Sequence, residues 1–145
     1  MKDIFISNSE VDTFSYGKEL SSKLVPGDIL ALVGNLGSGK TILTKGIANG
    51  IGIVDVVNSP TFKLISEYNS IPPLYHFDFY RIKSVKEIID FGIEYYYSNN
   101  GICIIEWANL FPNIIPNNAK WFFFEIGKNE NRKIFFKESF ENWKS

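Results

Sequence analysis

The sequence predicts an α/β fold with a mostly parallel sheet, flanking helices and a C-terminal antiparallel hairpin. A glycine-rich segment, 34–41, lies between a short apolar run and a segment with helical apolar spacing, which gives the order strand, loop, helix. The run 101–105 is continuously apolar, as is typical of a parallel strand buried on both faces. Near the C-terminus, 119–126 and 132–136 have the pattern of two strands joined across the turn 127–131.

The glycine-rich segment reads Gly-Asn-Leu-Gly-Ser-Gly-Lys-Thr and fits the pattern G-x-x-x-x-G-K-[ST], which predicts a sheet of the P-loop NTPase type. Glycines let backbone N–H groups approach an anion, and the N-terminus of the following helix points at the phosphates. Lys40 would place its ammonium group on the terminal phosphates, and the Thr41 hydroxyl would bind the Mg²⁺ that bridges them. The predicted nucleotide-binding residues of this loop are Gly34, Asn35, Leu36, Gly37, Ser38, Gly39, Lys40 and Thr41.

Strands and helices alternate before and after this loop. Residues 2–7 are a short strand candidate, and Ser9, with Asp12 three residues later, predicts the start of a helix. Pro26 and Gly27 are expected to end that helix. The second helix follows the loop and is expected to end at 50–52.

The second half begins with a turn at 58–61, followed by a strand at 62–68 and an alternating strand at 74–78. Ser84 predicts the cap of a helix that Gly92 ends. The strand 101–105 and the hairpin complete the sheet. We expect the hairpin to supply sheet and packing more than chemistry.

Two carboxylates follow predicted strands directly. Ligands of open α/β sheets bind beyond the carboxyl ends of the strands, so an acid there can reach a metal held by Thr41. Glu106 is the better candidate for a metal ligand, acting directly or through water. Asp78 could bind the metal or orient the attacking water, and the alternative is that it caps the turn near Tyr80 and Arg81.

Other side chains suit both chemical and structural roles. His76, the single histidine, lies in a predicted strand, and we interpret it as a hydrogen-bonded structural residue rather than a catalytic base. The triplet 90–92 reads Asp-Phe-Gly as in protein kinases, but no H-R-D loop precedes it and the chain is too short for that fold. The tyrosines 95–97 and Trp107 could stack on bases, although such rings lie more often in a core or an interface.

Composition limits the classes of function. The 145 residues carry 15 basic and 16 acidic side chains, so no global field favours a nucleic-acid or membrane partner. This length predicts one domain, 1–145. The single cysteine, Cys103, argues against a disulfide framework or a cysteine zinc site. With no apolar run near ~18 residues and no secretion signal, we expect a cytoplasmic protein without a membrane partner.

Five stretches together resemble a known family. The loop 34–41 is followed by Ser59-Pro60-Thr61-Phe62, by His76-Phe77-Asp78-Phe79-Tyr80-Arg81, by Phe91-Gly92-Ile93 and by Ile105-Glu106-Trp107. In order and spacing they resemble the TsaE (YjeE) family, bacterial P-loop ATPases of tRNA threonylcarbamoyladenosine biosynthesis. The second and third stretches are far more specific than the loop.

The resemblance implies ATP and Mg²⁺ as ligands. It implies that Lys40 and the loop backbone hold the phosphates of ATP, and that Asp78 supports catalysis. Thr61 would sit in a switch-like turn near the nucleotide. We accordingly take Lys40, Asp78 and Glu106 as catalytic residues, Thr41 and Glu106 as metal ligands, and Thr61 and Trp107 as further nucleotide-binding residues.

The resemblance also implies partners. The family acts with the TsaD and TsaB proteins, which transfer a threonylcarbamoyl group to the adenosine beside the anticodon of certain tRNAs, and we expect tRNA contact to be indirect through them. Asn35 departs from the family, which often has aspartate there; this removes a charge near the metal but leaves phosphate binding intact. Arg81 and Arg132 are the only arginines, so we expect slow hydrolysis that a partner accelerates.

Three other functions stay open. A small P-loop metabolite kinase usually carries an arginine-rich lid, which two arginines cannot provide. A GTPase typically needs an [NT]-K-x-D stretch for guanine, and the sequence has none. A nucleotide-sensing binding module, from a different class, would bind ATP tightly with negligible turnover.

Overall fold

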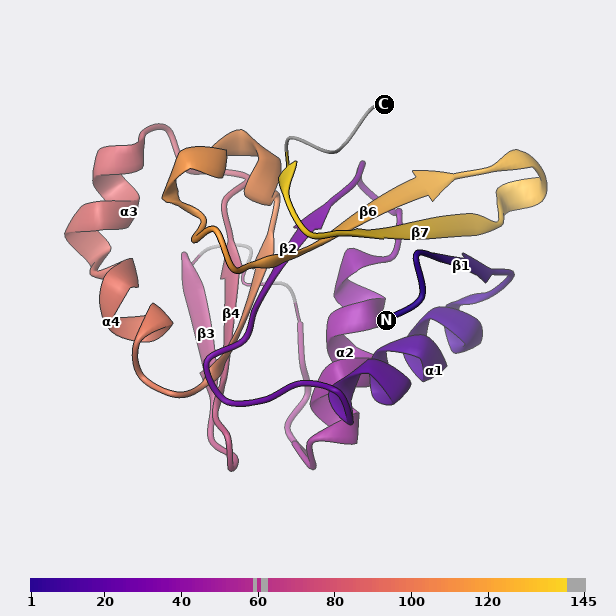
Figure 1. Ribbon diagram of the computed structural model, residues 1–145, viewed down its shortest axis with the longest axis horizontal. Helices are drawn as coiled ribbons and strands as arrows, with labels where there is room; N and C mark the ends of the chain where they lie inside the picture. Colours follow the sequence, from indigo (N-terminus) through magenta and orange to yellow (C-terminus); the bar gives the residue numbers. More distant parts are fainter. Residues whose placement is uncertain (59, 61–62, 141–145) are drawn as a thin grey trace.

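The computed structural model describes residues 1–58, 60 and 63–140. In this part of the chain seven strands form one sheet in the order β1-β7-β6-β2-β5-β4-β3 (Figure 1). The strands are β1 Ile4–Ser7, β2 Ile29–Val33, β3 Ile65–Tyr68, β4 Leu74–Asp78, β5 Ile102–Glu106, β6 Lys120–Ile126 and β7 Arg132–Lys137. The helices are α1 Glu10–Ser21, α2 Lys40–Gly50, α3 Val85–Phe91 and α4 Ile93–Tyr97, with 3₁₀ turns η1 Ala108–Leu110, η2 Pro112–Ile114 and η3 Lys128–Glu130.

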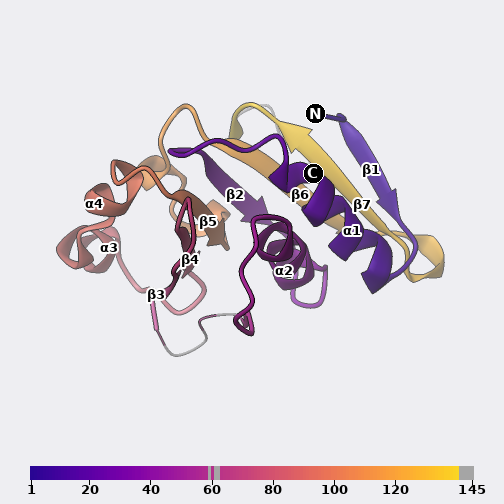
Figure 2. The same ribbon diagram turned by 90° about the horizontal axis from the view of Figure 1, so that it is seen from below.

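The centre of the sheet is parallel, and its edges are antiparallel. Strands β6, β2, β5 and β4 run parallel to one another. Strand β3 pairs antiparallel with β4, while β7 pairs antiparallel with both β6 and β1, so β1 and β3 form the two edges (Figure 2). A short connection such as that between β3 and β4 cannot join parallel strands, which need a crossover. The predicted α/β fold with its C-terminal hairpin is confirmed, with the parallel part confined to four strands.

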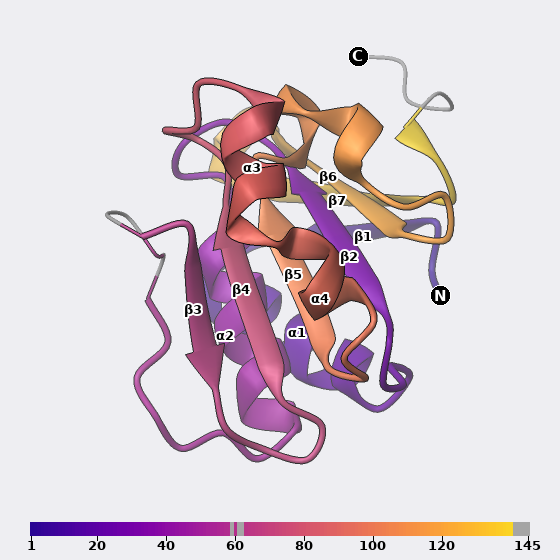
Figure 3. The same ribbon diagram turned by 90° about the vertical axis from the view of Figure 1, so that its left-hand side faces the viewer.

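Helices cover both faces of the sheet, α1 and α2 on one side and α3 and α4 on the other (Figure 3). In β2, Leu30 points into a core cluster with Leu43 of α2. The neighbouring Ile29 points into the opposite cluster with Ile88 of α3. Burial on both faces is why β2 and β5 are continuously apolar. No helix among the described residues is long and apolar enough to cross a membrane.

Close packing of α1 against α2 sets the position of the first helix. A Cβ atom on Gly46 would lie 2.1 Å from the Phe14 carbonyl oxygen, and one on Gly17 would lie 2.4 Å from the Leu43 carbonyl oxygen. Only glycine allows the two backbones to approach this closely. The first turn of α1 thereby lies against the glycine-rich loop, where Thr13 is 3.6 Å from the position of a Cβ on Gly39.

The predicted element ends are partly confirmed. Ser9 is the N-cap of α1 and accepts a hydrogen bond from the Asp12 N–H at 3.1 Å. The predicted end at Pro26 is wrong, because α1 stops at Ser21 and Leu24 packs on the core from the following turn. The predicted strand at 62–68 is shorter, since β3 begins at Ile65 after a bend at 63–64.

Candidate functional site

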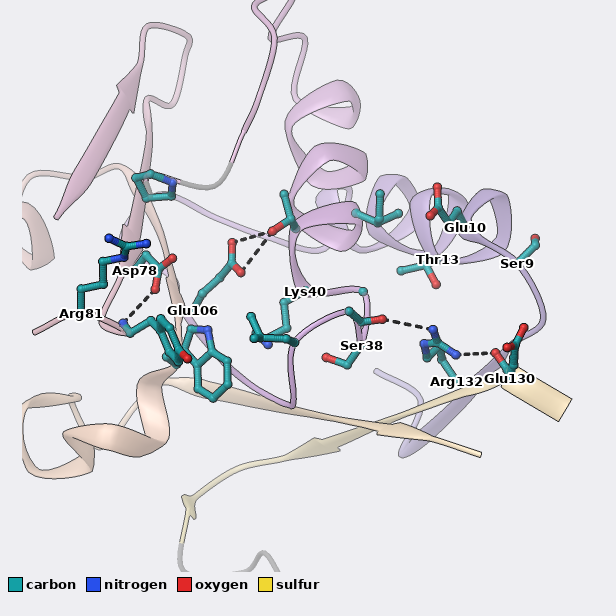
Figure 4. A pocket seen from close by; sticks show the side chains of 18 of the residues that line it. Ser9, Glu10, Thr13, Ser38, Lys40, Asp78, Arg81, Glu106, Glu130 and Arg132 are labelled. Atoms are coloured by element: carbon teal, nitrogen blue, oxygen red, sulfur yellow. Dashed lines mark hydrogen bonds between the residues drawn. The ribbon is translucent and has the colours of Figure 1, made fainter. Parts of the chain in front are cut away.

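A pocket of about 1010 Å³ opens at the carboxyl ends of β2, β4 and β5 (Figure 4). Five parts of the described chain line it: the glycine-rich loop with the start of α2, the start of α1, the segment before β3, the ends of β4 and β5, and the turn between β6 and β7. Both acids that follow predicted strands lie at this edge, side by side, because Asp78 and Glu106 are paired in the β4–β5 register. The sheet topology thus brings distant segments to one site.

The glycine-rich loop has the backbone that the motif requires. Gly37 and Gly39 have φ angles of 77° and 108°, a region that side-chain-bearing residues rarely adopt. Gly34 faces Ser38, and a Cβ there would lie 2.6 Å from the Ser38 hydroxyl oxygen. The Ser38 hydroxyl is buried and has no hydrogen-bond partner among the described residues. The loop therefore holds an unpaired polar group inside a tight backbone cradle.

Lys40, the first residue of α2, folds back over the loop. Its ammonium group donates to the carbonyl oxygens of Gly34 at 2.5 Å and Asn35 at 3.0 Å, and it lies 4.3 Å from the centroid of the Trp107 ring. Burial lowers the Lys40 pKa, while the nearby carboxylates of Glu106 and Asp78 act in the opposite direction. A partly desolvated cation therefore stands at the loop, where an anion would meet less competing water.

Glu106 joins three elements. The Thr41 hydroxyl, in the first turn of α2, donates to the Glu106 carboxylate with distances of 3.1 Å to Oε2 and 3.2 Å to Oε1. From β4, His76 places Nε2 at 2.6 Å from Oε2. His76 is fully buried and Glu106 is only 3% exposed. The expected hydrogen bond of His76 is present, and it is made to one of the predicted site residues.

Asp78 makes the turn-capping contact that was the alternative to a role at the metal. Its Oδ1 accepts a hydrogen bond from the Tyr80 N–H at 2.9 Å, so it caps the turn after β4. The same side chain lines the pocket at the level of Glu106. Capping one turn and serving the pocket are therefore compatible.

The hairpin contributes a side chain to the pocket. Arg132, at the start of β7, donates from Nη2 to the Gly37 carbonyl oxygen at 3.1 Å and from Nη1 to the Glu130 carbonyl oxygen. Arg81 lines the same pocket on the side of Asp78, away from Arg132 (Figure 4). The hairpin was expected to supply sheet and packing more than chemistry; β7 also starts beside the loop and brings Arg132 to the pocket. The scarcity of arginine was the one sequence signal that could have singled out Arg132.

The sequence did not predict that the start of α1 lines the pocket. Ser9 and Thr13 line the pocket, and the Thr13 hydroxyl is buried and hydrogen-bonded to the Ser7 hydroxyl at 2.7 Å. No motif marked these residues, since the cap pattern at Ser9 predicted only a helix start. Their place in the pocket results from the close packing of α1 on α2.

Trp107 lies at the pocket, and the tyrosine run does not line it. Trp107 has a positive φ of 59°, which turns the chain directly after Glu106 and places the indole over Lys40 and 4.7 Å from the Tyr80 ring. In α4, Tyr96 packs edge-on against Phe77, and the Tyr97 hydroxyl donates to the Ile114 carbonyl oxygen at 3.0 Å. These two tyrosines are packing residues, as the sequence analysis favoured.

One predicted residue cannot be placed. Thr61 lies outside the described residues, which resume at Lys63. Its neighbour Pro60 lines the pocket together with Lys63 and Leu64. The segment on either side of Thr61 therefore reaches the site.

The oxygen donors at this site fit a magnesium ion that is bound together with phosphates. Among the described residues, no group of three or more His, Cys, Asp or Glu side chains could hold a metal by itself. Mg²⁺ in nucleotide sites takes one or two protein oxygens and completes its shell with phosphate and water oxygens. The Thr41 hydroxyl and the Glu106 carboxylate are such donors, 3.1 Å apart at their closest.

The sequence of this chain is similar to a known protein family over most of its length. The family model "Threonylcarbamoyl adenosine biosynthesis protein TsaE" matches residues 7–134. The tRNA threonylcarbamoyladenosine biosynthesis protein TsaE of Bacillus subtilis is 40% identical over 126 residues, covering 86% of this chain and 78% of that protein. Its counterpart in Treponema pallidum is 33% identical over 129 residues, covering 89% and 96%.

A solved structure shares the fold over most of the chain. The crystal structure of YdiB from Bacillus subtilis superposes with a TM-score of 0.80 at 34% identity, covering 92% of this chain and 82% of that one. The family model and these relatives each span most of the chain, including the glycine-rich loop and the ends of β4 and β5 that line the pocket. The chain belongs to the TsaE family of threonylcarbamoyladenosine biosynthesis proteins.

Proposed function

We propose that this protein is the ATP-binding and ATP-hydrolysing component of the machinery that makes threonylcarbamoyladenosine in tRNA. The relatives from Bacillus subtilis and Treponema pallidum are named for that biosynthesis. The observation that carries the proposal is the contact between Thr41 and Glu106, made beside the buried ammonium group of Lys40. Phosphate and metal donors thus share one pocket.

The loop would hold the phosphates. Its backbone N–H groups and the N-terminus of α2 favour an anion, and the unpaired Ser38 hydroxyl offers one more donor. Lys40 would exchange its bonds to the carbonyl oxygens of Gly34 and Asn35 for phosphate oxygens. The magnesium ion, when bound, would neutralise phosphate charge, with Thr41 and Glu106 as its protein ligands.

The residues on the two sides of the pocket support one orientation of the bound nucleotide. Lys40, Thr41 and the acids Asp78 and Glu106 lie on one side of the loop, so the terminal phosphate belongs there. The nucleoside would then extend to the other side, along the first turn of α1 and toward Arg132. Thr13 and Arg132 line that side, and the guanidinium group is already held against the loop by Gly37.

Hydrolysis needs a water oriented in line with the terminal phosphate. Asp78 would take this role; its carboxylate lies at the same sheet edge as Glu106 and its Oδ1 accepts from the Tyr80 N–H, which supports the proposal. Arg81 lies on the same side of the pocket. A cation there would stabilise the charge that spreads over the phosphoryl group.

We further propose that TsaD and TsaB are the partners and that they gate hydrolysis, with tRNA reached through them. With a net charge of −1, the chain has no strong positive field that would attract the phosphates of tRNA directly. A partner that closes over the segment around Pro60 would cover the phosphate side of the pocket. Closure would exclude water and bring Arg81, or a cation of the partner, to the terminal phosphate.

Phosphate release tests this proposal. Turnover of ATP by the purified chain is measured with and without Mg²⁺, and with and without a purified TsaD–TsaB complex. We expect slow, Mg²⁺-dependent release that the complex raises. Tight ATP binding without release, even with the complex, would instead establish a nucleotide-sensing module, and transfer of phosphate to a metabolite would establish a kinase.

A further inference from the structure

We propose that His76 is a positioning residue that holds the Glu106 carboxylate in the orientation needed to bind the metal. The inference deepens the proposed ATP and Mg²⁺ site and rests on it. It starts from the shortest contact of Glu106, the 2.6 Å distance between His76 Nε2 and Glu106 Oε2.

The sheet register makes this contact possible. His76 is paired with Ile104 in the β4–β5 register, and side chains alternate along a strand, so His76 points to the same face as Ile104 and Glu106. The imidazole thus lies on the neighbouring strand two residues before Asp78, the residue opposite Glu106, and is within reach of the Glu106 carboxylate. It is fully buried, on the face that α1 and α2 cover.

Burial defines which nitrogen carries the proton. Nδ1 of His76 is buried and has no hydrogen-bond partner among the described residues. A proton on Nδ1 would leave a donor unsatisfied, whereas a proton on Nε2 is donated to the carboxylate. With Nε2 as the donor to Glu106, Nδ1 remains without a partner among the described residues.

Glu106 needs this donor because it is itself 3% exposed. A buried carboxylate is stable only when it is paired or hydrogen-bonded. In the part of the chain that the structure describes, Thr41 is the other side chain that donates to it, and the Thr41 hydroxyl would also bind the metal. His76 therefore holds Oε2 from within the sheet and leaves Oε1 as the oxygen with fewer protein donors.

The expected effect is on the metal and not on the nucleotide. Partners that orient a metal ligand typically change metal affinity or activity by about 10–100-fold when removed. Replacing His76 should therefore weaken the divalent ion bound with nucleotide, while affinity for nucleotide without a divalent ion stays near that of the wild type. A purely packing role would lower the stability of the fold and leave the metal affinity of the folded protein unchanged.

Three variants separate these outcomes. His76→Gln carries an amide N–H where Nε2 lies, His76→Asn carries it only where Nδ1 lies, and His76→Leu carries none. Binding of Mn²⁺ to the ADP complex is measured by electron paramagnetic resonance, with nucleotide affinity in the absence of metal and thermal unfolding measured alongside. We expect near wild-type Mn²⁺ affinity for His76→Gln and a loss of about 10-fold or more for the other two.

The outcomes distinguish this inference from the proposed function. If the wild type binds neither ADP nor Mn²⁺, the proposed site itself is wrong. If the wild type binds both and His76→Asn, in folded form, binds Mn²⁺ as well as His76→Gln does, only the positioning role is overturned. The Gln and Asn pair decides the matter even where His76→Leu does not fold.

A second readout needs no ligand. The chain has one histidine, so ¹⁵N NMR of the imidazole reports His76 alone. We expect the proton on Nε2 in the wild type and altered nitrogen shifts in Glu106→Gln. An Nε2 that carries no proton would overturn the assigned contact, because that nitrogen could then not donate to Glu106.

Discussion

Thr41 and Glu106 are 65 residues apart in the sequence, yet the Thr41 hydroxyl donates to both carboxylate oxygens of Glu106, at 3.1 and 3.2 Å. The contact exists because β2 and β5 are parallel neighbours with Leu32 opposite Glu106. Strand β2 therefore ends, and the phosphate loop begins, just beyond the level of this acid. Five predictions follow from this pocket and from the helices that frame it.

Glu106→Gln should reduce Mg²⁺-dependent ATP turnover by about 10–100-fold. The amide keeps the shape of the side chain and its contact with Thr41 but lacks the charge that a divalent ion needs. Nucleotide affinity without metal should change little. The measurement is steady-state phosphate release together with nucleotide binding, and Glu125→Gln, an exposed position on β6, is the control. Unchanged turnover in Glu106→Gln would show that this acid does not serve the metal.

Lys40→Ala should abolish productive ATP binding while the protein stays folded. The ammonium group bonds only to loop carbonyl oxygens in the described residues and lies under Trp107, so its loss removes phosphate contacts rather than core contacts. Calorimetric titration with ATP and a circular dichroism spectrum test both parts. Lys86→Ala, whose side chain is 81% exposed in a surface ion pair, should bind ATP normally. Wild-type affinity in Lys40→Ala would refute the assignment.

Arg132→Ala should weaken nucleotide binding by about 10-fold or more, since a hydrogen bond to a charged group contributes about 1.5–3 kcal/mol. Arg132 ties the β6–β7 turn to the loop through Gly37, so its loss also frees the loop. Lys133→Ala, the exposed neighbour, is the matched control and should bind as the wild type does. Equal affinities for the two variants would remove Arg132 from the nucleotide site.

Arg81→Lys should reduce the stimulation by partners more than the basal rate. An arginine that reaches the transferred phosphoryl group contributes roughly 10³–10⁵ in rate in P-loop NTPases, and lysine lacks its planar fork. Turnover of wild type and variant is compared alone and with the TsaD–TsaB complex. Fast turnover by the isolated wild type, unaffected by the complex, is the result that the gating proposal does not allow.

Tyr16→Phe should leave the free energy of unfolding at neutral pH unchanged or raise it. In alkali, the variant should lose stability less steeply than the wild type. The Tyr16 hydroxyl is buried without a hydrogen-bond partner among the described residues, and burial, followed by the charge of Glu19, raises its pKa from 10.0 to about 12. Between these two values the unfolded chain releases a proton that the folded protein keeps, so the free energy of unfolding falls as pH rises.

Urea unfolding from pH 7 to pH 11 measures this difference. Burial also raises the pKa of the Cys103 thiol, to about 12, so the wild type loses stability in alkali for more than one reason. The comparison of wild type with Tyr16→Phe isolates the contribution of Tyr16. Parallel stability curves for the two proteins across this range would contradict the prediction.

Local signals of the sequence determined much of this protein. The spacing of residues 34–41 depends only on neighbouring residues, and it identified the loop, the start of α2 and the groups that face a phosphate. The cap pattern of Ser9 and Asp12 placed the start of α1. A short apolar run indicated β2, and the continuous apolar run 101–105 identified β5 as a buried parallel strand. The same local pattern put Asp78 and Glu106 directly after predicted strands, where an acid can reach the pocket.

The tertiary structure decided which distant groups touch. The partner of His76 is Glu106 because β4 lies beside β5 in a register that no local pattern encodes. Arg132 reaches Gly37 because β6 pairs with β2 and the hairpin then returns to the loop, and Thr13 reaches the pocket because glycines bring α1 onto α2. Local sequence specifies backbone conformation and burial, whereas contacts across the sheet depend on strand order and register, which result from packing of the whole chain.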